Sequence, residues 1–273
     1  LSTYDDSIGH FDSVQVEMVV AGLMLIGGTS FTLHWRAVTG HPGAYWRSPL
    51  FRWYVAIFVT ATVVVAALLL SDGSGLGASL RSAVFNVATL LTSTGYGTDD
   101  FVTWLPAAQL VLLGLMVSGG MAGSTAGGVK LVRVRLVEAA ARRELRRVRH
   151  PRAVLPIRIG STPTPEGIVA RVIGYVALWV LIVITGTVVL ALLGTDLVTS
   201  SSAAVSVMSN MGPALGEAGP ASNFLVFTRP ARGLLMVMMV AGRLEILPVV
   251  VLLARSVDPV TRTTRQVEGR SRR

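Results

Sequence analysis

The chain has 273 residues, of which 52% are hydrophobic and only 14% are charged, and its mean hydropathy is +0.62. Soluble domains usually carry about 25% charged residues, so the composition excludes an ordinary soluble protein and indicates a polytopic membrane protein. The chain contains no cysteine, which excludes disulfides and thiolate metal sites.

Five apolar segments are predicted to be membrane helices. In chain order they cover 14–33, 53–70, 105–118, 168–193 and 233–254. A helix needs about 20 residues to cross a hydrocarbon core roughly 30 Å thick, so the third segment is too short to cross alone. Two further stretches, 78–91 and 197–208, are predicted to enter the membrane as short helices without crossing it.

Each short helix precedes a loop rich in glycine and small polar residues. The loops read TSTGYGT and SNMGPALG, with Gly95 and Gly212 at equivalent points. Because span, short helix, loop and span occur twice in this order, the chain contains an internal repeat of roughly 100 residues or more. The first residues resemble the second half of another repeat. We therefore expect the chain to be the C-terminal part of a longer protein, with a glycine before Leu1.

The charged residues predict the orientation of the chain in the membrane. The linker 33–53 has three arginines and no acid, 130–158 has Lys130 and nine arginines, and the tail after 254 has six arginines. We place these basic segments in the cytoplasm, so both glycine loops enter from the outside. The linkers that hold the loops are acid-leaning, with Asp72, Asp99, Asp100, Asp196 and Glu217.

The glycine loops predict a cation pathway. Non-helical backbone at membrane depth must be buried in protein or line water, and its carbonyl oxygens can replace the hydration shell of a cation. Glycine permits backbone angles that other residues avoid, and the acids nearby would raise the local cation concentration. The alternative is that each loop is merely a turn between two helices.

Four motifs resemble the Trk/Ktr/HKT superfamily of potassium uptake proteins, in particular its TrkH-like membrane subunits. They are LLTSTGYGTDDFVTWLP, GGMAGSTAGGVKLVRV, SNMGPALGEAGPASNF and GRLEI. The resemblance implies an all-α membrane protein with tandem membrane–pore-helix–membrane repeats and re-entrant filter loops around one pore. Residues 1–50 would then end the second repeat, 51–160 would form the third, and 161–273 the fourth with its basic tail.

The resemblance also implies uptake of K⁺ through a gated pore in the bacterial cytoplasmic membrane. The filter would consist of Ser93, Thr94, Gly95 and Tyr96 in the third repeat and Asn210, Met211 and Gly212 in the fourth. The fourth loop departs from the threonine-rich pattern. Backbone carbonyls need no particular side chain, so the assignment is kept.

The stretch GGMAGSTAGGVK interrupts the third apolar segment. Its paired glycines disfavour a helix, and its serine and threonine can satisfy the freed backbone groups. We expect a gating loop beside a water-filled pore, formed by Gly119, Gly120, Gly123, Ser124, Thr125, Gly127, Gly128 and Lys130. The alternative is a static kink that serves helix packing.

Arg243 lies within the last apolar segment, where a charge costs roughly 2.5–3.5 kcal/mol on insertion scales. Glu245 is two positions further on, so it does not face Arg243 on a helix. We expect Arg243 to project into the pore below the filter, where the matching arginine of the family obstructs the path. The alternative is a structural arginine bound by the carbonyls of a neighbouring helix.

The run VRVRLVEAAARRELRRVRHPR is predicted to be a basic cytoplasmic helix. Its charge alone would bind anionic lipid headgroups. The resemblance implies a homodimer and docking of a cytosolic RCK-type nucleotide-binding subunit (TrkA/KtrA-like), with nucleotide bound only by that partner and no nucleic acid. The docking residues would be Arg142, Arg143, Arg146 and Arg147.

Enzymatic function is not indicated. A Walker A loop needs G-x-x-x-x-G-K-[ST], but Val129 follows Gly128 and the lysine comes one position late. The four histidines lack metal-ligand spacing. Two alternatives to a channel stay open: a cation-coupled secondary transporter with broken helices, and a non-transporting scaffold that recruits a partner through the basic helix.

Overall fold

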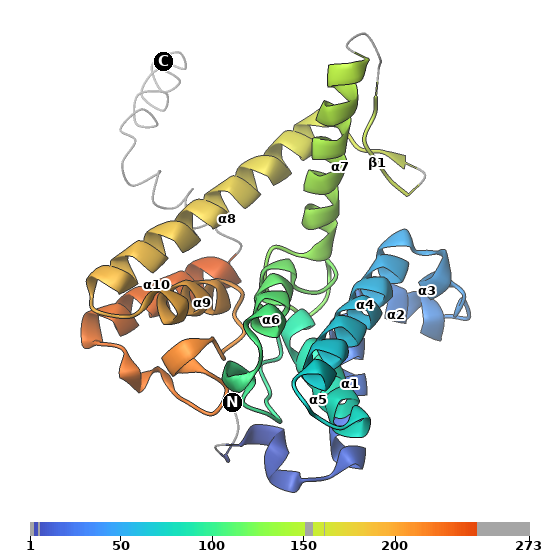
Figure 1. Cartoon of the computed structure of the whole chain (residues 1–273). Coiled ribbons are helices and arrows are strands. Elements are labelled where there is room, and N and C mark those ends of the chain that lie inside the picture. Colours follow the sequence, from blue (N-terminus) through green and yellow to red (C-terminus); the bar gives the residue numbers. More distant parts are fainter. Residues whose placement is uncertain (1–2, 5, 151–154, 161, 245–273) are drawn as a thin grey trace, which may run out of the picture.

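The computed structural model describes residues 3–4, 6–150, 155–160 and 162–244, which are mostly helical (Figure 1). The helices are α1 (Val14–Gly27), α2 (Phe31–Val38), α3 (Ala44–Arg47), α4 (Pro49–Ser71), α5 (Leu76–Leu91), α6 (Pro106–Ser118), α7 (Leu131–Arg149), α8 (Glu166–Leu192), α9 (Leu197–Met208) and α10 (Arg229–Arg243). One hairpin pairs the two-residue strands β1 (Arg158–Ile159) and β2 (Thr162–Pro163) antiparallel, with Arg158 opposite Pro163. Apart from this hairpin, the predicted all-α class is confirmed.

Among the described residues, α4 and α8 are each long and apolar enough to cross a membrane, and the bent pair of α1 and α2 passes the same test together. Helix α4 begins at a favourable site, because Ser48 accepts a hydrogen bond from the Phe51 N–H and Pro49 occupies the first turn. Helices α5, α6 and α9 are shorter apolar helices, in agreement with the predicted division into crossing and non-crossing segments.

The predicted span 14–33 is not one straight helix, because α1 and α2 meet within it at an angle of 98°. The hydroxyls of Thr29 and Tyr54 both donate to the Leu25 carbonyl, at 2.9 and 3.1 Å. A Cβ at Gly28 would lie 2.7 Å from the Tyr54 hydroxyl oxygen. Contacts with α4 therefore end α1 at a position that hydropathy does not reveal.

The last apolar segment also begins earlier than predicted, since α10 starts at Arg229 rather than near residue 233. Proline at the second position of α10 suits the first turn of a helix. The rest of this segment, from 245 to 254, and Glu245 with it, lie outside the described residues.

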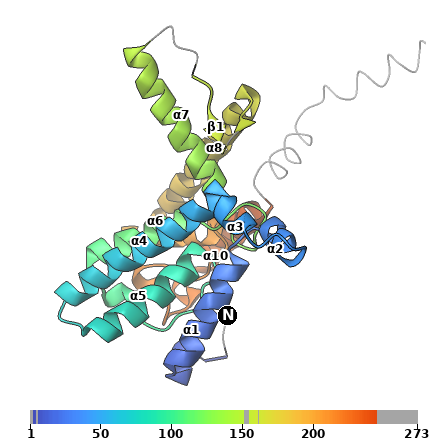
Figure 2. The same cartoon turned by 90° about the vertical axis from the view of Figure 1, so that its right-hand side faces the viewer.

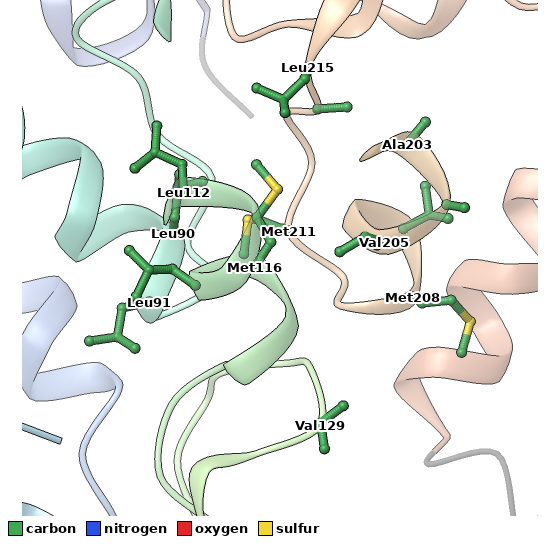
Figure 3. Packing of buried hydrophobic residues seen from close by; sticks show 14 of the residues in the cluster. Leu90, Leu91, Leu112, Met116, Val129, Ala203, Val205, Met208, Met211 and Leu215 are labelled. Atoms are coloured by element: carbon green, nitrogen blue, oxygen red, sulfur yellow. The ribbon is translucent and has the colours of Figure 1, made fainter. Parts of the chain in front are cut away.

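The short helices α5 and α9 each pack between the helix before and the helix after, in the same order. Helix α4 packs on α5 and α8 packs on α9, while α5 contacts α6 and α9 contacts α10. Helix α6 lies between the α5 side and the α9 side of the molecule, and α7 projects away from this bundle (Figures 1 and 2). Buried side chains from α5, α6 and the loop after α9 meet in one cluster that includes Leu90, Leu112, Met116 and Met211 (Figure 3).

Candidate functional site

The two glycine loops leave their helices with the same backbone conformation. Ser93 and Asn210 have φ angles of 53° and 52°, and Gly95 and Gly212 have φ angles of 82° and 122°. A positive φ is uncommon for residues other than glycine, so its recurrence at equivalent non-glycine positions shows that the loops are true structural repeats.

The same hydrogen bonds close both turns. Thr94 N–H donates to the Thr89 carbonyl at 2.9 Å, and Met211 N–H donates to the Ser206 carbonyl at 3.0 Å. This six-residue closure is a Schellman motif, which ends a helix through a left-handed residue. Local sequence therefore stops each short helix and turns the chain back at the loop.

The two filter glycines predicted from sequence line one cavity. It has a volume of about 380 Å³, and its walls include Gly95 and Gly212 together with Tyr4 and Ser7 of the N-terminal segment. A smaller cavity of about 190 Å³ shares two of the same wall residues and is lined by Asp6, Asp99 and Asp100. The fold thus brings three segments from distant parts of the sequence around one cavity, with carboxylates beside it.

Between α6 and α7, the segment 119–130 has no helix. It docks on the break between α1 and α2, where Met121 N–H donates to the Gly28 carbonyl at 3.0 Å and Phe31 N–H donates to the Gly123 carbonyl at 2.8 Å. The interrupted helix of one repeat therefore binds the interrupted helix of the repeat before it.

The hydroxyls in this loop satisfy backbone groups, as residues of this type do in broken helices. Ser124 Oγ donates to the Met121 carbonyl at 2.6 Å, and Thr125 Oγ1 donates to the Gly27 carbonyl at 3.0 Å. Lys130 has a φ of 73°, and α7 resumes at the next residue.

Two glycines of the loop are needed for close approach. At Gly119, which has a φ of 63°, a Cβ would collide with the Gly127 carbonyl oxygen. At Gly127, a Cβ would collide with the Ser209 carbonyl oxygen at the end of α9. The loop therefore lies directly against the end of α9, just before the segment 210–212.

Arg243 and the same loop line one cavity. A cavity of about 150 Å³ is lined by 124–128, Lys130, Asn210, Gly242 and Arg243. Asn210 Nδ2 also donates to the Met239 carbonyl of α10 at 3.2 Å. Of the predicted gating residues, Ser124, Thr125, Gly127, Gly128, Lys130 and Arg243 lie at this cavity, whereas Gly119, Gly120 and Gly123 do not line it.

Ion pairs within the chain involve three of the four arginines on α7 that were predicted to dock a partner. Arg143 pairs with Glu166 at the start of α8, and only 10% of its side chain is exposed. This hydrogen bond raises the pKa of Arg143 above its ordinary value. Arg142 pairs with Glu138, and Arg147 pairs with Glu144 at 3.1 Å. Arg143 therefore ties α7 to α8.

A buried ion pair between α1 and α5 was not predicted from the sequence. Glu17 is 2% exposed, and its carboxylate accepts hydrogen bonds from Arg81 Nε at 2.6 Å and Arg81 Nη2 at 2.7 Å. A signal was present, since each charge lies within an apolar helix and a buried charge requires a partner. Nothing in the local sequence identifies which partner it is.

Comparison with known proteins agrees with this architecture. The family model TrkH, described as cation transport protein, matches residues 1–259. The chain is 35% identical over 257 residues to the Trk system potassium uptake protein TrkH of Vibrio parahaemolyticus, covering 92% of this chain and 53% of that protein. It is 33% identical over 254 residues to the protein of the same name from Escherichia coli K12, covering 92% of this chain and 52% of that protein.

A solved structure shares the fold. The crystal structure of the potassium transporter TrkH from Vibrio parahaemolyticus superimposes with a TM-score of 0.87 at 34% identity, covering 95% of this chain and 55% of that chain. The chain spans about half the length of the curated relatives it matches. Since the family model covers nearly all of the sequence, this chain belongs to the TrkH family of cation transport proteins.

Proposed function

We propose that the natural gene product containing this chain takes up K⁺ across the bacterial cytoplasmic membrane through a gated pore. The observation that carries the proposal is that the two ends of the segment 210–212 line two different cavities. The outer cavity is lined by Gly95 and Gly212, and the inner cavity by Asn210 and Arg243. The names of the relatives, which are potassium uptake proteins, support K⁺ as the ion.

In this proposal the ion is dehydrated by backbone carbonyls of the two loops, Ser93–Tyr96 and Asn210–Gly212. The matched positive φ angles of the loops support this role, because they give both segments the same irregular backbone. The carboxylates of Asp6, Asp99 and Asp100 beside the outer cavity would concentrate cations there.

The gate is the loop 119–130 together with Arg243. A fixed positive charge at the inner cavity opposes the passage of cations, and the loop narrows the same space from the other side. Helix α7 follows the loop directly, so motion of α7 would move the C-terminal end of the loop. A cytosolic RCK-type subunit that binds α7 of a homodimeric protein would control this motion.

The filter is tested by Gly95→Ser in the natural gene product, expressed in a bacterial strain that lacks K⁺ uptake. Wild type is expected to support growth at low K⁺ and to take up ⁸⁶Rb⁺, whereas the variant is expected to discriminate K⁺ from Na⁺ less well. Gly73→Ser is the matched control, because Gly73 also has a positive φ, 91°, but lies at the end of α4 away from both cavities. Unchanged relative permeability in Gly95→Ser would contradict the filter assignment.

Two other functions predict different results when ⁸⁶Rb⁺ uptake is measured. Uptake that stops when the Na⁺ and H⁺ gradients are collapsed would indicate a coupled secondary transporter. Absence of ⁸⁶Rb⁺ uptake by correctly folded wild-type protein in proteoliposomes would indicate a membrane scaffold.

A further inference from the structure

Three hydroxyl side chains on α9 hold the backbone that follows the fourth-repeat loop. Thr199, Ser202 and Ser206 are each fully buried. They are spaced three and four residues apart, so they share one face of the helix. We call these three residues the hydroxyl ladder.

Each member of the ladder accepts a hydrogen bond from a backbone N–H of the returning chain. The donors are Gly212 to Ser206 at 3.2 Å, Leu215 to Ser202 at 2.9 Å and Glu217 to Thr199 at 3.0 Å. Gly216 permits the close approach, because a Cβ there would collide with the hydroxyl oxygen of Thr199. The segment 212–217 is therefore attached to α9 at three points along its length.

These hydrogen bonds also set the direction of carbonyl groups. In a planar trans peptide, the N–H of one residue and the carbonyl of the residue before it point in opposite directions. Because the Gly212 N–H points to Ser206 on α9, the Met211 carbonyl points away from α9. A carbonyl orientation in a predicted filter segment is thus determined by a hydroxyl on the helix behind it.

The third repeat has no such ladder. The equivalent positions of α5 carry Ser82, Phe85 and Thr89. The Thr89 hydroxyl is buried without a hydrogen-bond partner among the described residues. One amide makes the connection instead, since Asn86 Nδ2 contacts Thr98 Oγ1 and Asp99 Oδ2, both at 3.4 Å.

We propose that the hydroxyl ladder of Thr199, Ser202 and Ser206 positions the fourth filter segment and so contributes to ion selectivity. The inference rests on the proposed function of the loop as a filter. It also accounts for the departure of Asn210–Met211–Gly212 from a threonine-rich pattern: this segment is held through its backbone N–H groups, so its own side chains need not supply hydroxyls.

The test compares Ser206→Ala and Ser202→Ala with Ser201→Ala in the natural gene product. The hydroxyl of Ser201 donates within α9, to the carbonyls of Leu197 at 2.7 Å and Val198 at 3.2 Å, and makes no bond to the returning chain among the described residues. Alanine favours the helix in all three variants. We expect the Na⁺/K⁺ permeability ratio to rise roughly threefold to tenfold in the two ladder variants, as the loss of one hydrogen bond implies, and to stay unchanged in Ser201→Ala.

A second pair of variants covers the case in which a ladder variant does not fold. Thr199→Val keeps the shape of the side chain without its hydroxyl, and Thr199→Ser keeps the hydroxyl. Loss of selectivity in the first and wild-type selectivity in the second would support positioning through the hydrogen bond.

The two proposals fail in different ways. If the folded ladder variants take up ⁸⁶Rb⁺ with wild-type selectivity, the ladder proposal is overturned, whereas the proposed function as a K⁺ pore is not. If folded wild type takes up no ⁸⁶Rb⁺, the proposed function is overturned and the role of the ladder with it.

Discussion

Glu17 and Arg81 show how a single pair of residues joins two helices that are distant in the sequence. Their ion pair joins α1 to α5, which leads into the third-repeat loop. The Glu17 side chain is 3% exposed and that of Arg81 is 32% exposed, so the carboxylate depends on this partner. Asp12 adds a third contact at 3.3 Å, but its side chain is 92% exposed and contributes little.

Breaking a buried ion pair costs about 3–5 kcal/mol. Because water partly screens Arg81, we expect Glu17→Gln to lower the free energy of unfolding by an amount at the lower end of this range. The thermal midpoint in detergent should fall by roughly 6 °C or more. Asp12→Asn is the control and should leave the midpoint nearly unchanged. Equal midpoints for the two variants would show that the buried pair has no special role.

Asp196 caps α9, where its carboxylate accepts the Thr199 N–H at 3.0 Å. Desolvation acts to raise the pKa of Asp196, but hydrogen bonds from Thr199 and Val198 outweigh it, and the net pKa is lowered. A carboxyl with a lower pKa in the folded state stabilises the fold above its unfolded pKa of about 3.9. That contribution is lost as the pH falls through the folded value.

We therefore expect Asp196→Ala to lower the free energy of unfolding by about 1 kcal/mol at neutral pH. The difference from wild type should shrink as the pH falls below about 4. Asp196→Asn also caps a helix and does not titrate, so it should remain close to wild type at neutral pH. A deficit of Asp196→Ala that is the same at pH 3 and pH 7 would argue against the ionised cap.

At the scale of elements, two broken helices bind each other through backbone groups. Hydrogen bonds from Met121 and Phe31 join the loop 119–130 to the break between α1 and α2. Gly127 brings the loop against Ser209 at the end of α9. A local change in this loop would therefore be felt directly at the end of α9 and in the segment 210–212 that follows it.

Removing Ala122–Gly127, or making Arg243→Ala, is expected to raise basal ⁸⁶Rb⁺ flux in the absence of the regulatory subunit. The deletion shortens the loop that narrows the inner cavity, and the substitution removes the positive charge of Arg243 from the same cavity. Arg229→Ala is a control, because Arg229 is an exposed arginine at the start of the same helix and does not line that cavity. If both test variants fold and conduct no faster than wild type, the glycines serve packing alone.

At the scale of the whole molecule, α7 and the start of α8 extend from the membrane bundle as one arm (Figures 1 and 2). The pair between Arg143 and Glu166 joins the two helices. Arg142 and Arg146 are exposed on α7. The ion pair of Arg143 therefore holds the two helices of the arm together, while the exposed arginines form a basic surface that a partner could reach.

Charge reversal of the exposed arginines, Arg142→Glu with Arg146→Glu, is expected to reduce co-purification with the cytosolic subunit and to impair regulated flux. Glu166→Gln is the matched control, because it weakens the link between α7 and α8 without altering the exposed arginines. If the double variant keeps both co-purification and regulated flux, α7 is only an anchor on anionic lipid.

Most of the apolar helices, their repeat and the loops between them could be predicted from the sequence. Hydropathy and length separate crossing from non-crossing helices, while consecutive glycines and a basic run mark where a helix stops and resumes. These properties are local, so they could be read without coordinates. The boundaries of α9 and the start of α7 after Lys130 agree with the sequence analysis for this reason.

Only the tertiary structure decided which distant residues meet. The bend after α1 depends on the Tyr54 hydroxyl of α4, and the partner of Glu17 lies on another helix. In the sequence, the serines and the threonine of α9 are not distinguished from other small residues of a short helix. Only the structure shows that the returning chain donates hydrogen bonds to their hydroxyls. Periodicity assigns residues to a face of a helix, but packing between helices chooses what lies against that face, and no local pattern contains that choice.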